Sequence, residues 1–199
     1  MDVITDPNNR QRVFAALNAT GLFRSDNGGQ SWTKLAGGLP ASDFGRIALA
    51  VGPPLQPSTN ATIVAAVAAT NDKILGIYGT LDNGATWTRV TQPPASGQAN
   101  YNLAIAVDPT DSRVLYFGTS ANEANDGGTV FRSTNAGESW QDLSKGDATS
   151  GGLHADTHAI VVSSRNPNIV ITGNDGVNVL TGNLGNDTFS GLAGADIIN

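Results

Sequence analysis

The sequence predicts an all-β protein, and three observations carry that prediction. The chain has 199 residues, of which 24 are glycine, and only 14% are charged. Its apolar runs are short, rich in β-branched and aromatic residues, and separated by Pro, Gly, Asn and Asp. That pattern is typical of strands joined by turns. One long unit then recurs along most of the chain, and a nine-residue repeat replaces it at the end.

Three octets mark the long unit: SDNGGQSW (25–32), TLDNGATW (80–87) and STNAGESW (133–140). Their tryptophans lie 55 and 53 residues apart (87 minus 32, and 140 minus 87), which suits one four-stranded sheet per unit. An apolar strand is expected before each octet, at residues 21–25, 74–80 and 129–134. A short strand is expected after each one, at residues 32–35, 87–90 and 140–143.

Each unit begins with two more predicted strands joined by a polar turn. Residues 102–120 give the clearest case, and residues 46–70 repeat the plan with a longer turn. Residues 2–17 hold a shortened first copy, whereas residues 158–173 begin a fourth unit that never reaches an octet. Asp6 and Asp108 each precede a proline, and we expect them to cap their turns.

The octets resemble the Asp-box, or BNR, repeat, with the pattern Ser/Thr-x-Asp-x-Gly-x-Thr/Ser-Trp. The family includes sialidases, xyloglucanase-like glycoside hydrolases and sortilin-type receptors. The resemblance implies that residues 1–172 form a partial β-propeller of three blades plus part of a fourth. Asp82 keeps the family's acid, whereas Asn27 and Asn135 replace it. An Asn retains the acceptor that bonds the turn, so we interpret the boxes as architectural, with each Trp packed between blades.

Residues 173–199 change to a period of nine: GNDGVNVLT, GNLGNDTFS and GLAGADIIN. Each repeat opens with Gly, has Gly again at its fourth position, and has a large apolar residue at its eighth. This segment contains three aspartates and no Lys or Arg, so it carries a charge of −3. Uncompensated carboxylates favour a hard cation such as calcium.

The nonapeptides resemble the RTX, or hemolysin-type calcium-binding, repeat. That resemblance implies a parallel β-roll with about eighteen residues per coil, in which repeats one and three stack. Calcium is then the expected cofactor, with Asn178, Asp187 and Asp196 at the ligating sixth position and Asp175 as a spare ligand. The alternative is a Gly/Asn-rich tail that stays unfolded until further coils follow.

One polar cluster, GGLHADTHAIVVS (151–163), contains both histidines of the chain. His154, Asp156 and His158 are spaced by two, so on a strand they would share one face. Two imidazoles and a carboxylate can contact a ligand, bind a transition metal or transfer a proton. The alternative is a purely structural role, with hydrogen bonds to the loop that enters the strand.

Composition excludes several classes of function. The net charge of −6, with no basic stripe, argues against a nucleic-acid partner. The chain has no cysteine, which excludes disulfides and thiolate catalysis. The longest apolar stretch, residues 62–70, is far below the roughly 18 residues of a membrane span. No signal peptide follows Met1, and because the chain opens as if inside a repeat, we expect a fragment or a fusion.

The preferred interpretation is part of a bacterial secreted or surface protein, in which a propeller scaffold recognises a carbohydrate or protein ligand. The RTX resemblance implies an extracellular or cell-surface location reached by one-step (type I) secretion. Open blade edges would favour self-association, because unpaired strands template pairing. The alternative is a glycoside hydrolase of the Asp-box class, which needs two carboxylates roughly 5–10 Å apart. Asp156 is a weak candidate for one of them, and the sequence singles out no partner.

Overall fold

The computed structural model describes residues 1–93, 98–120, 130–143, 157–165, 170–173, 179–180 and 197–198. These residues are all β and contain no helix, so none could cross a membrane as a long apolar helix. The strands of the first two sheets are β1 (Asp2–Asp6), β2 (Asn9–Leu17), β3 (Gly21–Ser25), β4 (Thr33–Lys34), β5 (Phe44–Pro54), β6 (Ala61–Ala69), β7 (Ile74–Thr80) and β8 (Thr88–Val90). The remaining strands are β9 (Ala104–Val107), β10 (Leu115–Gly118), β11 (Val130–Ser133), β12 (Gln141–Asp142), β13 (Ala159–Val162), β14 (Val170–Gly173), β15 (Val179–Leu180) and β16 (Ile197–Ile198).

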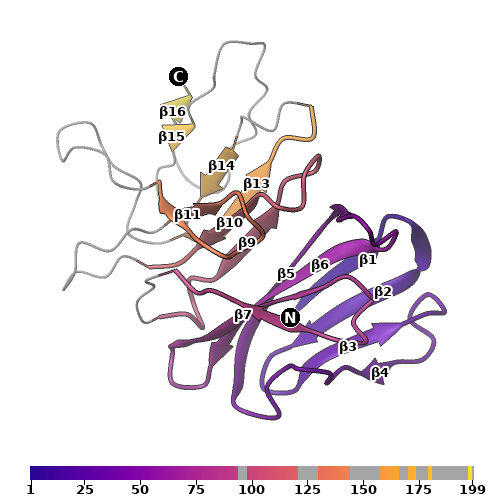
Figure 1. The fold of residues 1–199 in the computed structure, drawn as a ribbon. Coiled ribbons are helices and arrows are strands. Elements are labelled where there is room, and N and C mark those ends of the chain that lie inside the picture. The colour runs from indigo at the N-terminus through magenta and orange to yellow at the C-terminus, as the bar shows by residue number, and fades with distance from the viewer. Residues whose placement is uncertain are drawn as a thin grey trace.

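Three four-stranded antiparallel sheets follow one another along the chain. Their strand orders are β1-β2-β3-β4, β5-β6-β7-β8 and β9-β10-β11-β12, so each sheet is a simple meander. A two-stranded sheet, β13-β14, follows them. Figure 1 shows the sheets placed one after another, and the first strands β1, β5, β9 and β13 contact their neighbours in that order. The all-β prediction is confirmed, and the arrangement is propeller-like.

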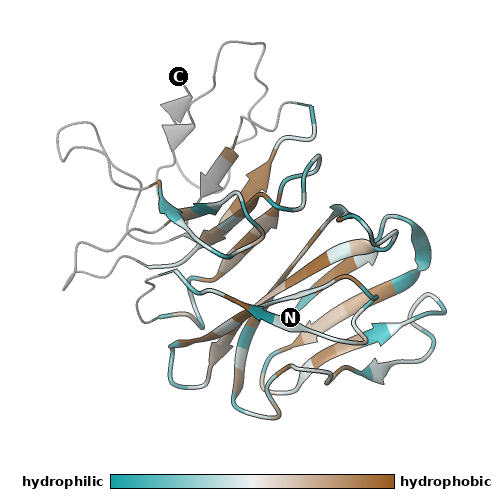
Figure 2. Ribbon diagram, in the orientation of Figure 1, coloured by the Kyte–Doolittle hydropathy of each residue, from teal (hydrophilic) through white to brown (hydrophobic). Residues whose placement is uncertain are grey.

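The core lies between successive sheets. One cluster joins the first and second sheets, another joins the second and third, and a third reaches from β9–β11 to β13 and β14. Strand β6 is buried along its whole length because Ile63 and Val67 face the first sheet while Val64 faces the third. A strand covered on both faces needs a continuous apolar run. Figure 2 shows that run as a brown stretch of ribbon within the molecule.

Strand positions agree closely with the sequence prediction. Strands β3 and β7 have the predicted bounds, whereas each box tryptophan precedes the next strand instead of beginning it. The turn-capping prediction is confirmed: Asp6 Oδ1 accepts a hydrogen bond from Asn8 N at 2.8 Å, and Asp108 Oδ1 accepts one from Thr110 N at 2.8 Å. These bonds close the polar turns between the first two strands of the first and third sheets.

Strands β15 and β16 form a separate parallel pair. Val179 is opposite Ile197 and Leu180 is opposite Ile198, so the partners are eighteen residues apart (197 minus 179). The register joins the seventh and eighth positions of the first nonapeptide to the same positions of the third. The rest of residues 174–199 lies outside the described part of the chain.

Candidate functional site

A cavity of about 280 Å³ opens where the first strands of the sheets meet, and we call it the inner-strand cavity. Its lining comes from the N-terminal end of β1, from β5, from β9 and from the start of β13. The polar side chains of this lining are Asp2, Arg46 and His158, and apolar residues such as Ile105 and Ile160 form the rest. Because four separate sheets contribute, the cavity exists only when the sheets pack together.

Arg46 is positioned by the loop that leads from the second sheet to the third. Its guanidinium donates to the carbonyl oxygen of Tyr101, and its backbone N donates to Asn100 Oδ1 at 2.7 Å. Asn100 in turn donates through Nδ2 to the Ala69 carbonyl at 2.9 Å. The loop therefore fixes the start of β5 and directs a cation toward the cavity.

An aromatic ring borders the same site. The Tyr101 ring meets the His158 imidazole edge to face, with 4.6 Å between the ring centroids and 85° between the planes. Tyr101 is 56% exposed, and its contact with His158 places it at the border of the cavity. On the opposite side, Asp2 Oδ2 accepts a hydrogen bond from Leu49 N at 2.7 Å, which ties β1 to β5.

The structure places one of the three predicted ligand-contact residues. His158 precedes β13 and lines the inner-strand cavity, whereas His154 and Asp156 lie outside the described residues. The calcium-ligand candidates Asn178, Asp187, Asp196 and Asp175 also lie outside them. Within the part of the chain that the structure describes, no group of three or more His, Cys, Asp or Glu side chains could hold a metal ion.

Sequence reasoning missed Arg46, although a signal for it exists. Arg46, Asn102 and His158 each stand directly before an equivalent apolar run, IALAV, LAIAV or AIVVS. A polar residue at the entry of the inner strand is therefore shared by these three units. Only the side-by-side packing of β5, β9 and β13 brings Arg46 to the cavity.

The boxes form closed hydrogen-bonded turns, as their architectural interpretation predicts. In the second box, Asp82 Oδ1 accepts from Thr80 Oγ1 at 2.7 Å and from Thr86 N at 2.9 Å. Burial opposes ionisation of Asp82, but the hydrogen bonds from Thr86 and Thr80 outweigh it and lower the pKa of the carboxyl below its ordinary value of 3.8. The carboxylate therefore stabilises the turn in its charged form.

Asn27 and Asn135 reproduce this network with one change of donor. In each of these boxes the Asn Oδ1 accepts from the serine hydroxyl and from a backbone N, while its Nδ2 donates to a second serine, as in the 2.8 Å bond from Asn27 to Ser31. In the Asp box that last bond runs the other way, from the Thr86 hydroxyl to Asp82 Oδ2. A hydroxyl can donate or accept, which is why both side chains fit.

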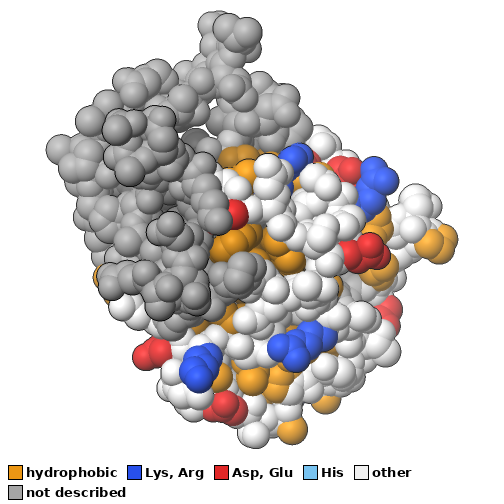
Figure 3. All heavy atoms as spheres, turned by 60° about the vertical axis from the view of Figure 1, so that its left-hand side comes forward, with side chains coloured by type: hydrophobic (Ala, Val, Ile, Leu, Met, Phe, Trp, Pro, Cys, Tyr) orange, Lys and Arg blue, Asp and Glu red, His pale blue; other side chains and the backbone are white. Residues whose placement is uncertain are grey.

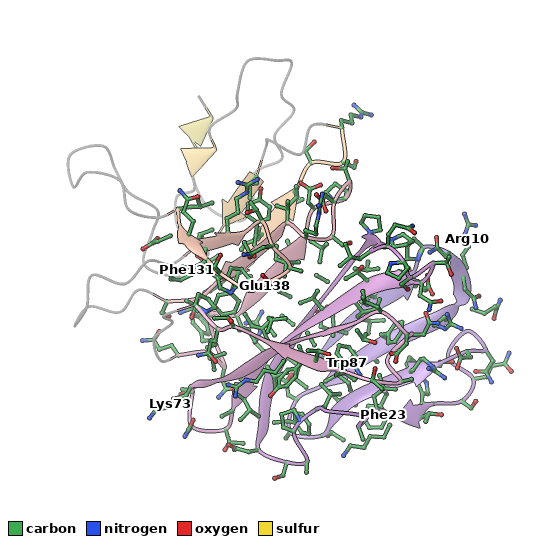
Figure 4. The ribbon with its side chains drawn as sticks, viewed as in Figure 1. Arg10, Phe23, Lys73, Trp87, Phe131 and Glu138 are labelled. Atoms are coloured by element: carbon green, nitrogen blue, oxygen red, sulfur yellow. The ribbon has the colours of Figure 1, made fainter. Side chains whose placement is uncertain are left out.

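Tryptophans of the second and third boxes join neighbouring sheets. Trp87 is 5% exposed and belongs to the core cluster shared with the first sheet, where Figure 4 shows it among the packed side chains. Its backbone N donates to the Gly37 carbonyl at 2.6 Å. Trp140 donates through Nε1 to the carbonyl of Thr91, the residue after β8 of the second sheet, at 2.6 Å. Trp32 is 43% exposed, since no described sheet lies beyond the first.

Charged side chains are scattered over the described surface. On the face in Figure 3, Lys and Arg side chains stand apart from one another and alternate with Asp and Glu. The best-formed ion-pair cluster joins Arg12 and Arg24 to Asp26, at 2.8 and 2.9 Å. The Arg12 guanidinium, through its hydrogen bond, lowers the pKa of the Asp26 carboxyl. This cluster stabilises the first sheet.

Successive four-stranded meanders whose first strands lie side by side define a β-propeller domain. The chain belongs to the DUF6242 beta propeller domain family, whose model matches residues 4–190. That span includes the first two nonapeptides as well as strands β2 to β14.

Curated relatives of the chain include xyloglucanases. It is 28% identical over 146 residues to a xyloglucanase of Paenibacillus sp., and 26% identical over 148 residues to Xyloglucanase Xgh74A of Acetivibrio thermocellus. A xyloglucanase of Hypocrea jecorina is 26% identical over 158 residues. These matches cover 69%, 69% and 74% of this chain, but only 14%, 17% and 18% of the relatives. The chain thus spans less than a fifth of each enzyme.

Solved structures share the fold. The GH74 xyloglucanase from Xanthomonas campestris gives a TM-score of 0.60 at 21% identity, over 87% of this chain and 27% of the other. An ancestral GH74 enzyme gives 0.57 at 24% identity, over 87% and 21%. YCF48 bound to a D1 peptide gives 0.53 at 15% identity, over 83% and 46%. At these identities the likeness concerns the fold alone.

Proposed function

We propose that this domain binds a carbohydrate at the inner-strand cavity, as part of a larger bacterial secreted or surface protein. The observation that carries the proposal is the combination of Asp2, Arg46 and His158 in one cavity with the exposed residue Tyr101 at its border. Ligand sites in proteins combine a concave surface with a few convergent polar groups. The similarity to xyloglucanases supports a sugar as the ligand.

The chemistry of the cavity suits a neutral sugar. A carboxylate accepts hydrogen bonds, a guanidinium donates them in a fixed fork, and an imidazole can do both. Together they can bond several hydroxyl groups of one pyranose. An aromatic ring such as that of Tyr101 offers an apolar surface for the C–H face of the sugar. A volume of about 280 Å³ accommodates one sugar ring.

Calorimetric titration with a xyloglucan oligosaccharide tests this proposal. We expect saturable binding by the wild-type chain and a loss of at least tenfold in affinity for Arg46→Ala. Arg10→Ala is the matched control, because Arg10 is exposed on β2 and lies on the far side of the molecule from the third sheet (Figure 4). Equal affinities for wild type and Arg46→Ala would contradict the assignment of the cavity.

There are two alternatives to carbohydrate binding. The cavity could bind a protein ligand instead of a sugar, or the protein could be a glycoside hydrolase. The peptide in the YCF48 structure supports the former, and the xyloglucanase relatives support the latter. Hydrolysis needs two carboxylates, and Asp2 is the carboxylate that the described part of the cavity supplies. If the wild-type chain releases reducing sugar from xyloglucan and Asp156→Asn abolishes the release, the hydrolase interpretation replaces the binding one.

We also propose that the nonapeptides bind calcium and begin a β-roll, which would fold after one-step export. The parallel register of β15 with β16, eighteen residues apart, is the offset that stacked coils of two nonapeptides require. Asn178 and Asp196 would then face each other in the loops of repeats one and three, with Asp175 as a spare ligand. Asp187, in repeat two, would bind calcium on the other side of the roll, together with a further repeat. Oxygen ligands of this kind suit calcium.

Thermal unfolding of the full chain tests the calcium proposal. With millimolar calcium the unfolding transition of wild type should rise by several degrees, whereas Asp196→Asn should lose that rise. Magnesium at the same concentration is the control for ionic strength. A calcium effect that persists in the combined Asp187→Asn and Asp196→Asn variant would contradict the ligand assignment.

Self-association is proposed through the open face of the first sheet, where Val3, Leu17 and Trp32 are exposed. This face lies on the side of the sheet opposite to Phe14, which packs toward the second sheet. Sedimentation velocity should show concentration-dependent dimers that Trp32→Ala weakens. A monomer at all accessible concentrations would contradict the proposal.

A further inference from the structure

A second cavity, of about 420 Å³, lies between the second and third sheets, at the end of the molecule where the boxes form their turns. We call it the inter-sheet pocket. Its lining is largely apolar and includes Val64, Leu81, Val90 and Leu115. It is separate from the inner-strand cavity, because the two share no lining residue.

The equivalent space between the first and second sheets is filled by side chains. Phe14 is buried there, and its ring lies against the second box, where a Cβ on Gly84 would come within 3.3 Å of it. Arg24, directly opposite Phe14 in the strand register, donates through Nη1 to the Asn83 carbonyl across the interface at 2.8 Å. An aromatic ring and a guanidinium therefore close this first interface.

The second sheet lacks both groups at the matching positions. Val64 is paired with Gly79 in the second sheet, just as Phe14 is paired with Arg24 in the first sheet. Arg24 and Gly79 are equivalent, because each directly precedes the first residue of its box. Val64 is much smaller than Phe14, and Gly79 has no side chain at all. A Cβ built on Gly79 meets no atom within 4 Å. The pocket is thus the volume that the ring and the guanidinium would otherwise occupy.

The polar groups of the pocket favour a cation. Asp82 is the only charged side chain among the described lining residues. The lining of the pocket also includes Ala136, whose position in the third box matches that of Asn83 in the second box. In the first interface the Asn83 carbonyl accepts a hydrogen bond from the Arg24 guanidinium. Thr62 and Ser112 already donate their hydroxyl protons to the Pro53 carbonyl, so they add little hydrogen-bonding capacity.

We propose that the inter-sheet pocket binds a small ligand with an aromatic ring and a cationic nitrogen, such as an arylalkylamine. The ring occupies the place of the missing Phe14 equivalent, beside Val64 and Val90. The nitrogen occupies the place of the missing guanidinium, near Asp82 and the backbone of Ala136. The volume lies within the range of about 300–1,000 Å³ that is usual for small-molecule sites. This inference does not depend on the function proposed for the inner-strand cavity.

The probe is benzylamine, and its binding to the full chain is measured by two-dimensional ¹⁵N–¹H NMR. We expect saturable shifts at Gly79, Leu81 and Ala136, with a dissociation constant on the order of 1 mM for a ligand of this size. The variant that combines Val64→Phe with Gly79→Arg restores the residues of the first interface and should weaken binding at least tenfold. Gly79→Arg alone is the second variant, should the double one fail to fold.

Two further comparisons test the charge. Asp82→Asn keeps a side chain that the other two boxes already use, so the turn is retained while the negative charge is lost. It should weaken benzylamine binding at least threefold and leave binding of benzyl alcohol unchanged. The proposal is overturned if benzylamine gives no saturable shifts in wild type, or if the pocket-filling variants bind it as well as wild type does.

Discussion

Replacement of the box tryptophans measures how strongly the sheets depend on one another. Trp87 and Trp32 occupy the same position of their boxes, and each donates through Nε1 to a glycine carbonyl of its own turn, at 3.2 and 3.0 Å. They differ in packing, because Trp87 is 5% exposed and Trp32 is 43% exposed. Comparing Trp87→Ala with Trp32→Ala therefore cancels the hydrogen bond and isolates the contact between sheets.

The structure sets the expected size of the effect. Removal of a buried Trp side chain costs about 3–5 kcal/mol of unfolding free energy, so Trp87→Ala should lose that amount. Trp32→Ala should lose about 1 kcal/mol or less, since surface substitutions have small effects. Because total stability is about 5–15 kcal/mol, Trp87→Phe serves as the milder variant if Trp87→Ala does not fold.

Urea unfolding followed by circular dichroism gives both free energies. We predict that the two alanine variants differ in unfolding free energy by at least about 2 kcal/mol. Equal losses would refute it, because they would mean that Trp87 contributes only to its own turn and that the sheets are stable independently.

Three further predictions follow from local geometry. Gly38→Ala should lower the unfolding free energy by about 2 kcal/mol or more, because Gly38 has a φ of +104° and the new Cβ would lie 2.2 Å from the Trp87 carbonyl oxygen. Gly79→Ala is the control, and it should leave the unfolding free energy unchanged or raise it. Ala136→Gly should stabilise by about 0.5–1 kcal/mol, because Ala136 has a φ of +56°; a loss of stability would contradict this. At pH 7, Asp82→Ala should cost about 2 kcal/mol and Asp82→Asn less than about 1 kcal/mol. Because the pKa of Asp82 is lowered in the folded state, its carboxylate stabilises the fold at pH above 3.8, and this stability is lost as pH falls through the folded-state pKa. The unfolding free energies of wild type and Asp82→Asn should therefore converge as the pH is lowered. A difference between them that stays constant with pH would contradict the pKa shift.

Sequence alone predicted the repeating unit well because each box is a local structure. The hydroxyl, the Asp or Asn, and the glycine that close a turn lie within eight residues, so the spacing of Asp82 and Gly84 in the sequence contains most of the geometry. Short apolar runs rich in β-branched and aromatic residues, bounded by turn residues, likewise predicted the strands. The burial of β6 on both faces accounts for its unbroken apolar run.

Sites between sheets were much harder to predict. Arg46 and His158 are more than a hundred residues apart, and they meet only because β5, β9 and β13 pack in order. The inter-sheet pocket has a different cause, since it results from what Val64 and Gly79 lack relative to Phe14 and Arg24. That difference appears only when the repeats are aligned by strand register, because the octets themselves begin one residue later.

The central claim, that the inner-strand cavity binds a carbohydrate, is tested most directly by locating a bound oligosaccharide on the chain. Amide shifts in ¹⁵N–¹H spectra during titration with a xyloglucan oligosaccharide would give that location. We predict shifts concentrated around the cavity, at Arg46, Tyr101, Ile105 and His158, with the box turns unaffected. Shifts that spare those four residues and gather on another surface would contradict it.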